Sequence, residues 1–517
     1  MAWSGALRTG RGGTWIAGRV FRRPLSSVPL RGFGQDEGAP VRALAVLALG
    51  VSGVGLLADR PASRSFVEGR VPKFKPGWSR PTSCQSIVAQ PPPARQAESG
   101  LSVAIVGGGL GGLALAVGLL AAGVDVVVYE KARRLRDASQ GTISIWPNGA
   151  KALTALDPEL PEALCSAGCA PVRSAVILGR KEQERAGPNS SVIDATPMFK
   201  AFSERFGVGA MFAAWTDVQK VLAARVPEAR VQCGKELVGI DERGGGGGGV
   251  TLRFADGTEA VADVAVAADG TFSAARRLLQ DGGRLPPGGK VRFFGQTNWA
   301  SIIEGHQSAL LGDKSVEGSL AMLNIAGENP IAAAVVRLGN DRTFWQVRVR
   351  DDDRALRSTD ETGSLGAAGA KERVLELVRG VPELAAAVEA TPEAKIYERS
   401  IYDLHPPLPR YVAGRVVLLG DAAHAPHSVP GQGANFAFED AAELASLLGG
   451  LPAGGDGLQA ALEAYEAARL ERCHSMQTWA AEAGAAQKDG APPAGPEERA
   501  RRSAYLYGWQ PPSCRPA

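Results

Sequence analysis

The sequence predicts an α/β fold with an inserted β-sheet domain and a C-terminal helical segment. Three observations support this expectation. Residues 101–130 have the pattern of strand, glycine-rich turn, helix and strand, which is typical of a parallel sheet. A second apolar strand ends in Asp269-Gly270, and a third ends in Gly420-Asp421. Because ligands of such sheets bind beyond the carboxyl ends of the strands, the three turns indicate one shared site.

The first turn, GGGLGG at residues 107–112, matches the GxGxxG pattern of dinucleotide-binding proteins. Gly107 allows the tight turn, Gly109 lets the backbone approach a pyrophosphate, and Gly112 permits close packing of helix on strand. The helix that follows directs its unpaired N-terminal amides at the phosphates. Glu130 ends the second strand, where an acid can accept hydrogen bonds from the adenosine ribose. Together these features predict a Rossmann-like domain.

The six consecutive glycines at residues 244–249 satisfy the same pattern, but they separate two alternating, strand-like runs. They are therefore interpreted as the tip of a hairpin. With no second credible dinucleotide loop, NAD(P)H would bind without a Rossmann unit of its own.

The second and third turns carry the remaining expected cofactor contacts. Asp269 and Gly270 precede a helix that bears Ser273 near its start and Arg276 one turn later. Asp421 ends a strand in the same way, and a glycine-rich turn then opens another helix. Three turns suited to bind phosphate and sugar groups, in this order, predict that the chain binds one FAD. The glycine-rich turn that opens this helix consists of Gly431, Gln432, Gly433, Ala434 and Asn435.

These elements suggest a domain plan. Residues 100–175, 216–289 and 401–450 are assigned to the FAD-binding domain, and residues 451–517 to a C-terminal helix and tail. The intervening residues 176–215 and 290–400 are rich in strand-like segments and are assigned to an inserted substrate domain. Beyond a long helix that starts at Leu458, the end of the chain is expected to be a proline-rich turn with a short aromatic tail.

The residues before position 100 differ from the rest in charge. Residues 1–98 carry 14 Lys and Arg against 5 Asp and Glu, whereas the remaining 419 residues carry 43 against 49. Residues 1–42 have the arginine-rich, acid-poor start of an organellar transit peptide, for either mitochondrion or plastid. The mildly acidic body argues against nucleic-acid binding.

The apolar segment 43–58 follows. Sixteen helical residues would span about 24 Å, less than the roughly 30 Å of a bilayer core. The segment is consistent with a short membrane anchor, a second targeting signal or an accessory helix, and residues 59–99 have the composition of a disordered linker.

The six cysteines include no CxxC pair, and we expect no metal site. Cys165 and Cys169 have helical i,i+4 spacing, which is compatible with two thiols on one face, but ordinary buried thiols explain them better.

From about residue 100 to 480, the chain resembles the single-component, FAD-dependent aromatic hydroxylases, a superfamily that includes para-hydroxybenzoate hydroxylases, urate hydroxylases and zeaxanthin epoxidase. The residues at 269–276 match the family's DGxxSxxR element, and Gly420, Asp421 and His424 match its GDAAH element. The resemblance implies that Asp421 holds the ribityl chain and that the amides of residues 431–435 approach the flavin's pyrimidine edge. The Trp146-Pro147-Asn148-Gly149 turn is similar to the form found in the urate-hydroxylase and epoxidase branches.

Two positions depart from the family pattern. Val218 and Leu222 fit the family's RxxLxxxL element, so Trp215 stands where the arginine is expected. Ser428 stands where the family has a proline, four residues after the GDAAH histidine. In relatives this second segment faces the reacting flavin and the substrate.

The resemblance implies a monooxygenase in which NAD(P)H reduces the flavin and O₂ forms a hydroperoxyflavin that gives one oxygen atom to a substrate. The cofactor performs the difficult step, so no catalytic triad or metal-ligand set is needed. The substrate is expected to be an aromatic or isoprenoid small molecule, with membrane association through residues 43–58. The one candidate for proton transfer is His427, for which a structural role is the alternative.

Two other functions fit the same fold. One is a flavin-dependent reductase or dehydrogenase that resembles geranylgeranyl reductases, and the other is a non-catalytic binding protein.

Overall fold

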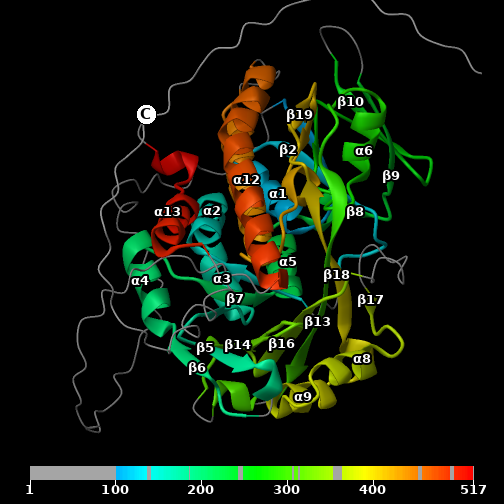
Figure 1. Ribbon diagram of the computed structural model, residues 1–517. Helices are drawn as coiled ribbons and strands as arrows, with labels where there is room; N and C mark the ends of the chain where they lie inside the picture. The colour runs from blue at the N-terminus through cyan, green and yellow to red at the C-terminus, as the bar shows by residue number, and fades with distance from the viewer. Residues whose placement is uncertain are drawn as a thin grey trace, which may run out of the picture. The chain divides into compact units, whose positions relative to one another are not determined.

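The computed structural model describes residues 100–136, 141–184, 187–242, 248–305, 308–312, 315–352, 364–451, 457–489 and 494–515 (Figure 1). The predicted transit peptide, apolar segment and linker, residues 1–99, lie outside the described residues. Within the described part of the chain, no helix combines the length and the apolar character needed to cross a membrane.

A six-stranded, mostly parallel sheet carries the three predicted turns, as the sequence indicated. Its central strands are hydrophobic on both faces, as expected when helices cover both sides. Their order is β19 (Val412–Ala413), β20 (Val416–Leu418), β12 (Val264–Ala267), β1 (Ser102–Val106), β2 (Asp125–Glu130) and β8 (Val231–Cys233), with β19 antiparallel.

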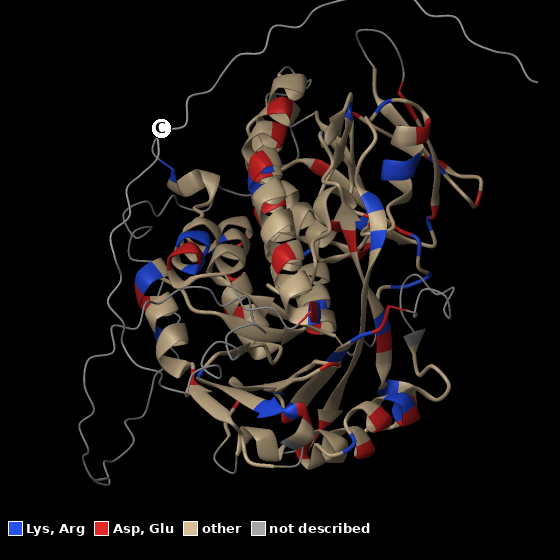
Figure 2. Ribbon diagram, viewed as in Figure 1, with Lys and Arg blue, Asp and Glu red and all other residues tan. Residues whose placement is uncertain are grey.

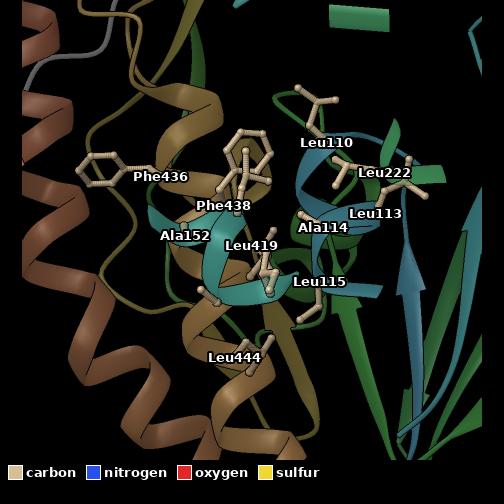
Figure 3. Packing of buried hydrophobic residues seen from close by; sticks show 14 of the residues in the cluster. Leu110, Leu113, Ala114, Leu115, Ala152, Leu222, Leu419, Phe436, Phe438 and Leu444 are labelled. Atoms are coloured by element: carbon tan, nitrogen blue, oxygen red, sulfur yellow. The ribbon is translucent and has the colours of Figure 1, made fainter. Parts of the chain in front are cut away.

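Two helices that are far apart in the sequence pack together beside this sheet, α1 (Leu110–Ala121) and α11 (Gly433–Gly449). Gly118 allows the close approach, because a Cβ there would lie 2.8 Å from the Ala445 side chain. Figure 3 shows Leu113 and Leu115 of α1 in the same apolar cluster as Phe438 and Leu444 of α11. This packing brings the start of α11 to the glycine-rich turn.

The second large sheet has eight strands, mostly antiparallel, and corresponds to the strand-rich segments that the sequence suggested. Their order is β17 (Ser364–Leu365), β18 (Tyr397–His405), β13 (Lys290–Glu304), β16 (Arg342–Arg350), β15 (Ile331–Leu338), β14 (Ser319–Ala326), β5 (Ser174–Lys181) and β6 (Ser191–Asp194).

The eight-stranded sheet buries both of its faces. One face holds Trp299, Trp345 and Val347, which pack against α8 (Ala370–Leu377) and α9 (Pro382–Glu389). The other face contributes to the main core that contains the six-stranded sheet. Figure 2 shows Lys and Arg together with Glu on α8, whereas the charged residues of α9 are glutamates.

The described part of the chain also forms two three-stranded sheets. One consists of β9 (Leu237–Glu242), β10 (Val250–Phe254) and β11 (Glu259–Ala262), and the antiparallel pairing of Glu242 with Val250 confirms the predicted hairpin. The other consists of β3 (Thr142–Ile145), β7 (Met211–Ala214) and β4 (Ala170–Pro171).

The C-terminal residues differ from the prediction. The long helix α12 (Leu458–Asp489) is present, but the expected turn and tail contain a further helix, α13 (Pro496–Tyr507). Pro496 at the first helical position, with Glu497 and Glu498 in the first turn, favours a helix start there. Among the described residues, the other α-helices are α2 (Pro147–Leu156), α3 (Leu160–Ser166), α4 (Thr196–Phe206), α5 (Trp215–Ala223), α6 (Ala274–Asp281) and α10 (Asp421–His424).

Trp345→Ala tests how strongly α9 is bound to the eight-stranded sheet. Trp345 is fully buried, and its indole N–H donates a hydrogen bond to the Thr391 hydroxyl over 2.9 Å. Its removal leaves a cavity and takes away one of the two hydrogen bonds of the Thr391 hydroxyl, which also donates to the Ala387 carbonyl oxygen. The free energy of unfolding should therefore fall by about 3–5 kcal/mol in chemical denaturation. Val192→Ala, at a side chain that is 63% exposed on β6, is the control and should change it little.

Candidate functional site

The glycine-rich turn has the geometry that each of its three glycines requires. Gly107 has φ +114°, and a Cβ there would lie 2.4 Å from the Ala268 carbonyl oxygen. A Cβ on Gly112 would lie 2.1 Å from the Gly107 carbonyl oxygen. A Cβ on Gly109, by contrast, would meet no atom within 4 Å. Gly107 and Gly112 are therefore required by the fold itself, whereas Gly109 leaves space beside the N-terminal amides of α1.

Glu130 braces this turn from the end of β2. Its carboxylate accepts hydrogen bonds from the amides of Gly108, over 2.8 Å, and Ala132, over 2.9 Å. Gln219 of α5, which the sequence analysis did not single out, donates from its side-chain amide to the Gly108 carbonyl oxygen over 2.7 Å. The turn is thus held from both sides, and the ribose contact of Glu130 stays a prediction.

The second turn is stabilised by its own side chains. Asp269 accepts hydrogen bonds from the Ser273 hydroxyl, over 2.5 Å, and from the Ala275 amide, over 3.1 Å, at the N-terminus of α6. The Ser273 hydroxyl in turn accepts from the Arg276 amide. Gly270 has φ +85°, a left-handed conformation that favours glycine. Asp269 therefore orders this turn through its contacts with the start of α6.

Arg276 connects the second turn to the third. Its guanidinium is buried and donates to the carbonyl oxygens of Ala422, over 2.7 Å, and Thr271, over 2.6 Å. Burial lowers the pKa of Arg276 to about 10, although Asp269 opposes that shift. A cation that serves two carbonyl groups in this way fixes the spacing between the turns.

The third turn meets the glycine-rich start of α11. Asp421 accepts a hydrogen bond from the Thr271 hydroxyl over 3.1 Å. A Cβ on Gly433 would lie 3.6 Å from the nearer Asp421 oxygen, so the start of α11 lies against this carboxylate. Gly433 and Ala434 are both partly exposed there, and Gly431 adopts φ +61°. The structure therefore brings all three predicted turns together.

Asn435 has a role that the sequence analysis did not foresee. Its side-chain oxygen accepts from the Trp146 amide over 2.8 Å, and its side-chain nitrogen donates to the carbonyl oxygens of Ser144 and Gly431. The Trp-Pro-Asn-Gly turn is thereby tied to the start of α11. Trp146 itself stacks on Phe199 of α4 and on Tyr507 of α13.

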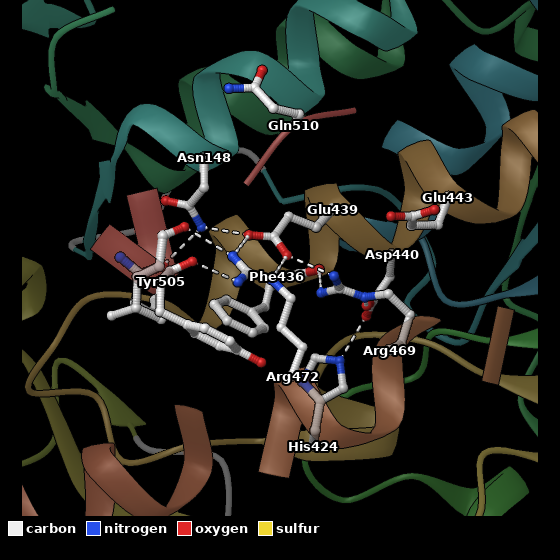
Figure 4. A network of polar contacts seen from close by, with 12 residues as sticks. Asn148, His424, Phe436, Glu439, Asp440, Glu443, Arg469, Arg472, Tyr505 and Gln510 are labelled. Atoms are coloured by element: carbon white, nitrogen blue, oxygen red, sulfur yellow. Dashed lines mark hydrogen bonds and ion pairs between the residues drawn. The ribbon is translucent and has the colours of Figure 1, made fainter. Parts of the chain in front are cut away.

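A buried network of ion pairs holds these turns in position (Figure 4). Glu439 accepts hydrogen bonds from Asn148, Arg469 and Arg472, at 2.6–2.7 Å. Asp440 accepts from the Gly420 amide, His424 and Arg469. Both carboxylates lie on α11 and both arginines on α12, so the network ties the third turn and α2 to the C-terminal helix.

His424 and Asp440 form the buried end of the network, where Nε2 of His424 lies 2.6 Å from Oδ2 of Asp440. Burial disfavours the imidazolium, but the interactions with Cys473 and Asp440 outweigh it and raise the pKa of His424 well above its ordinary value. Burial likewise opposes ionisation of Asp440, yet His424 and Arg469 lower its pKa to about 2. These buried contacts give His424 a structural role.

The ligating atoms of His424, Asp440 and Cys473 lie within 4.8 Å of one another, a spacing compatible with a metal ion. Both oxygens of Asp440 already accept hydrogen bonds from His424 and from Arg469. This bonding makes the cluster part of the ion-pair network.

The Cys165–Cys169 pair does not form one helical face, because α3 ends at Ser166. Burial raises the pKa of both thiols, as expected for structural cysteines.

His427 is fully buried, which favours the structural alternative for this residue. Its Nε2 lies 2.8 Å from the Gln296 side-chain oxygen, and its Nδ1 accepts from the Val429 amide. Burial and three nearby cations, Arg348, Arg292 and Lys488, lower the pKa of His427 well below its ordinary value. The ring is therefore neutral near pH 7 with both nitrogens in use.

The donor set fits FAD. Three turns converge, one with open space above a helix N-terminus and one with a carboxylate at its edge, as a pyrophosphate and a polyol chain require. The comparisons with known proteins agree. Residues 211–480 match the FAD binding domain family, and residues 105–143 match the NAD(P)-binding Rossmann-like domain family.

The chain is 30% identical, over 73% of its length and 88% of the relative's, to the aurachin C monooxygenase/isomerase of Stigmatella aurantiaca. The chain belongs to the FAD-dependent aromatic hydroxylase family.

Other members of the family are similarly related. An FAD-dependent urate hydroxylase of Klebsiella pneumoniae is 29% identical over 72% of this chain and 86% of its own. The chain spans 55% of the length of a dual trans-enoyl reductase/FAD-dependent monooxygenase from Aspergillus terreus. The structure of Klebsiella pneumoniae HpxO complexed with FAD and uric acid shares the fold, with a TM-score of 0.61, 24% identity and coverage of 79% of this chain and 93% of that one.

The two residues that depart from the hydroxylase family pattern, Trp215 and Ser428, each contact an arginine side chain. The Arg136 guanidinium lies over the Trp215 ring, 5.0 Å from its centroid, so a cation stands beside the position where the family has arginine. The Ser428 hydroxyl accepts a hydrogen bond from Arg348 of β16 over 3.0 Å, a contact that proline cannot make.

Gly109→Ala and Gly112→Ala should separate FAD affinity from stability. The Gly109→Ala methyl meets open space, so the free protein should keep its stability while the blocked phosphate approach lowers FAD affinity about tenfold or more, roughly 1.4 kcal/mol. The Gly112→Ala methyl clashes with backbone and should destabilise the FAD-free protein by about 1–3 kcal/mol. Flavin fluorescence titration and thermal unfolding measure the two effects; equal behaviour of the variants would contradict the assignment.

The His424–Asp440 pair should give stability a specific pH dependence. Since the folded-state pKa of His424 is raised, its contribution is complete below about pH 6.5 and falls as the pH rises toward the folded-state value. The loss of unfolding free energy in His424→Gln should therefore be larger near about pH 6 than near about pH 9. Urea denaturation at both values tests this, and the opposite order would show that the buried imidazole is neutral.

Proposed function

We propose that the protein takes electrons from NAD(P)H and transfers one oxygen atom of O₂ to an aromatic or unsaturated small molecule. The observation that carries this proposal is the convergence of three turns with the geometry of an FAD site in a chain that belongs to a family of monooxygenases. When bound, FAD supplies the electron storage and oxygen activation that this chemistry requires.

The residues of the chain have binding and positioning roles in this function. The amides at the start of α1 would bind the pyrophosphate, and Asp421 would hold the ribityl hydroxyls. The amides at the start of α11, around Gly433 and Ala434, would stabilise negative charge that develops on the flavin ring, in the manner of an oxyanion hole. Asn435, Arg276 and Glu130 keep these groups in place through the contacts described above.

The absorption spectrum of the flavin tests the function. Full-length protein loaded with FAD should lose its flavin absorbance when titrated anaerobically with NADPH and regain it in air. Addition of a substrate should accelerate NADPH oxidation and incorporate one ¹⁸O atom from ¹⁸O₂, measured by mass spectrometry. Product without ¹⁸O would support the reductase, and a chain that cannot bind FAD would support a binding protein.

For the N-terminal residues, we propose that 1–42 direct the protein to a mitochondrion or plastid and that 43–58 associate it with a membrane. The arginine-rich, acid-poor composition of the first and the apolar run of the second support this proposal. Fluorescent fusions of residues 1–42 and 1–58 separate the two roles. A cytosolic signal from both fusions would contradict it.

A further inference from the structure

A row of polar side chains crosses the eight-stranded sheet. From one edge to the other, the row runs through β14, β15, β16, β13 and β18, and its members lie opposite one another on paired strands. They are, in that order, Asn324, Ala332, Arg348, Asn298 and Arg399. Residues directly opposite each other on paired strands project from the same face of a sheet. Five adjacent strands therefore place two amides and two guanidinium groups on one face.

This face is the one directed toward the FAD elements. Arg348 donates to the Ser428 hydroxyl, over 3.0 Å, and to the Gln487 side-chain oxygen, over 3.2 Å. Ser428 lies between α10 and α11, in the segment that follows the third turn. The neighbouring row on the same face contains Ala300 and Ala334 of the main core, with Gln346 of β16 between them. The polar row is thus bordered by apolar side chains on β13 and β15.

The row contains polar atoms that are buried without a hydrogen-bond partner. They are Asn298 Oδ1, Asn324 Nδ2, Arg348 Nε and Arg399 Nε. Arg348 is only 8% exposed. A buried polar group normally has a partner because leaving it unpaired costs free energy, so four such atoms in one row indicate a site for a polar ligand.

The charges nearby are positive. Burial lowers the pKa of Arg348 to about 10, and Arg399 lowers it further in the same direction. The nearby carboxylates are bound elsewhere: Asp403 pairs with Arg292, Asp352 with Arg350 and Lys488, and Asp351 accepts from Thr297. Among the described residues, no ion pair joins Arg348 or Arg399 to an acid.

We propose that this row binds the negatively charged group of an organic anion, a carboxylate or a deprotonated ring, on an aromatic or heteroaromatic substrate. The inference rests on the proposed function and specifies its substrate class. A guanidinium has five N–H donors, and the two described bonds of Arg348 leave its Nε–H and one N–H on each terminal nitrogen. A guanidinium that presents two adjacent N–H groups can bind a carboxylate through two hydrogen bonds.

The same row disfavours an uncharged isoprenoid or quinone in contact with it. Such a ligand would seal two cations from water without supplying a counter-charge, which costs free energy. An anionic ring instead pairs the guanidinium groups and places its carbon skeleton against Ala300 and Ala334 of the adjoining row.

Isothermal titration calorimetry on the full-length, FAD-loaded protein tests the inference without turnover. The probes are 4-hydroxybenzoate, 3-amino-4-hydroxybenzoate and urate, with 4-hydroxybenzamide and a short-chain ubiquinone as uncharged counterparts. At least one anion should bind, and 4-hydroxybenzamide should bind at least about tenfold more weakly than 4-hydroxybenzoate if that acid is the ligand. Arg348→Gln should remove the preference for the anion, and Arg348→Lys should restore part of it.

Arg350→Gln is the matched control, since Arg350 lies two residues along the same strand but is exposed and pairs with Asp352. It should keep the preference of the wild type. If Arg348→Gln fails to fold, Arg399→Gln provides the same test from β18. Binding of none of the three anions, a stronger affinity for the uncharged probes, or a preference that survives both substitutions would overturn the inference. NADPH oxidation without anion binding would leave the monooxygenase assignment intact, whereas loss of FAD binding would contradict that assignment first.

Discussion

Four charged side chains on two helices, Glu439 and Asp440 of α11 and Arg469 and Arg472 of α12, form ion pairs in the protein interior. Ion pairs of this kind carry a desolvation cost of several kcal/mol per ion, which is recovered only when every charge has well-placed partners. Here Asp440 also binds the Gly420 amide, and Glu439 also binds Asn148. Every charge in the network has its partners only when the third turn and α2 are in place. The FAD-binding elements therefore depend on α12, a helix outside the Rossmann-like unit.

The sequence predicted those parts of the site that follow from local geometry. Gly107 and Gly112 are required because any side chain would collide with backbone a few residues away or on the adjoining strand. Because of these steric constraints, a short glycine motif follows the end of a strand in the sequence. The turns and the parallel sheet could therefore be recognised without a structure. Glu130 was placed correctly at the end of β2, although its described contacts brace the turn itself.

Roles that depend on distant partners were not predictable in this way. Asn435 was expected to contribute backbone contacts, yet its side chain binds a turn 289 residues away in sequence. Glu439 and Arg472 resemble ordinary surface charges of amphipathic helices until their helices are packed together. The polar row on the eight-stranded sheet depends on strand register, which places Arg348 opposite Asn298 and cannot be deduced from either strand alone.

The order of strands in the six-stranded sheet also constrains how the protein folds during synthesis. β1 pairs with β12, about 160 residues later, and β12 pairs with β20, a further 150 residues along the chain. A ribosome that has released β1 and α1 has therefore not yet made the neighbours that shield their apolar surfaces. Contacts between residues so far apart in sequence slow folding and prolong the lifetime of aggregation-prone intermediates. The apolar surfaces of β1 and α1 are therefore fully covered only after β12, β20 and α11 have been synthesised.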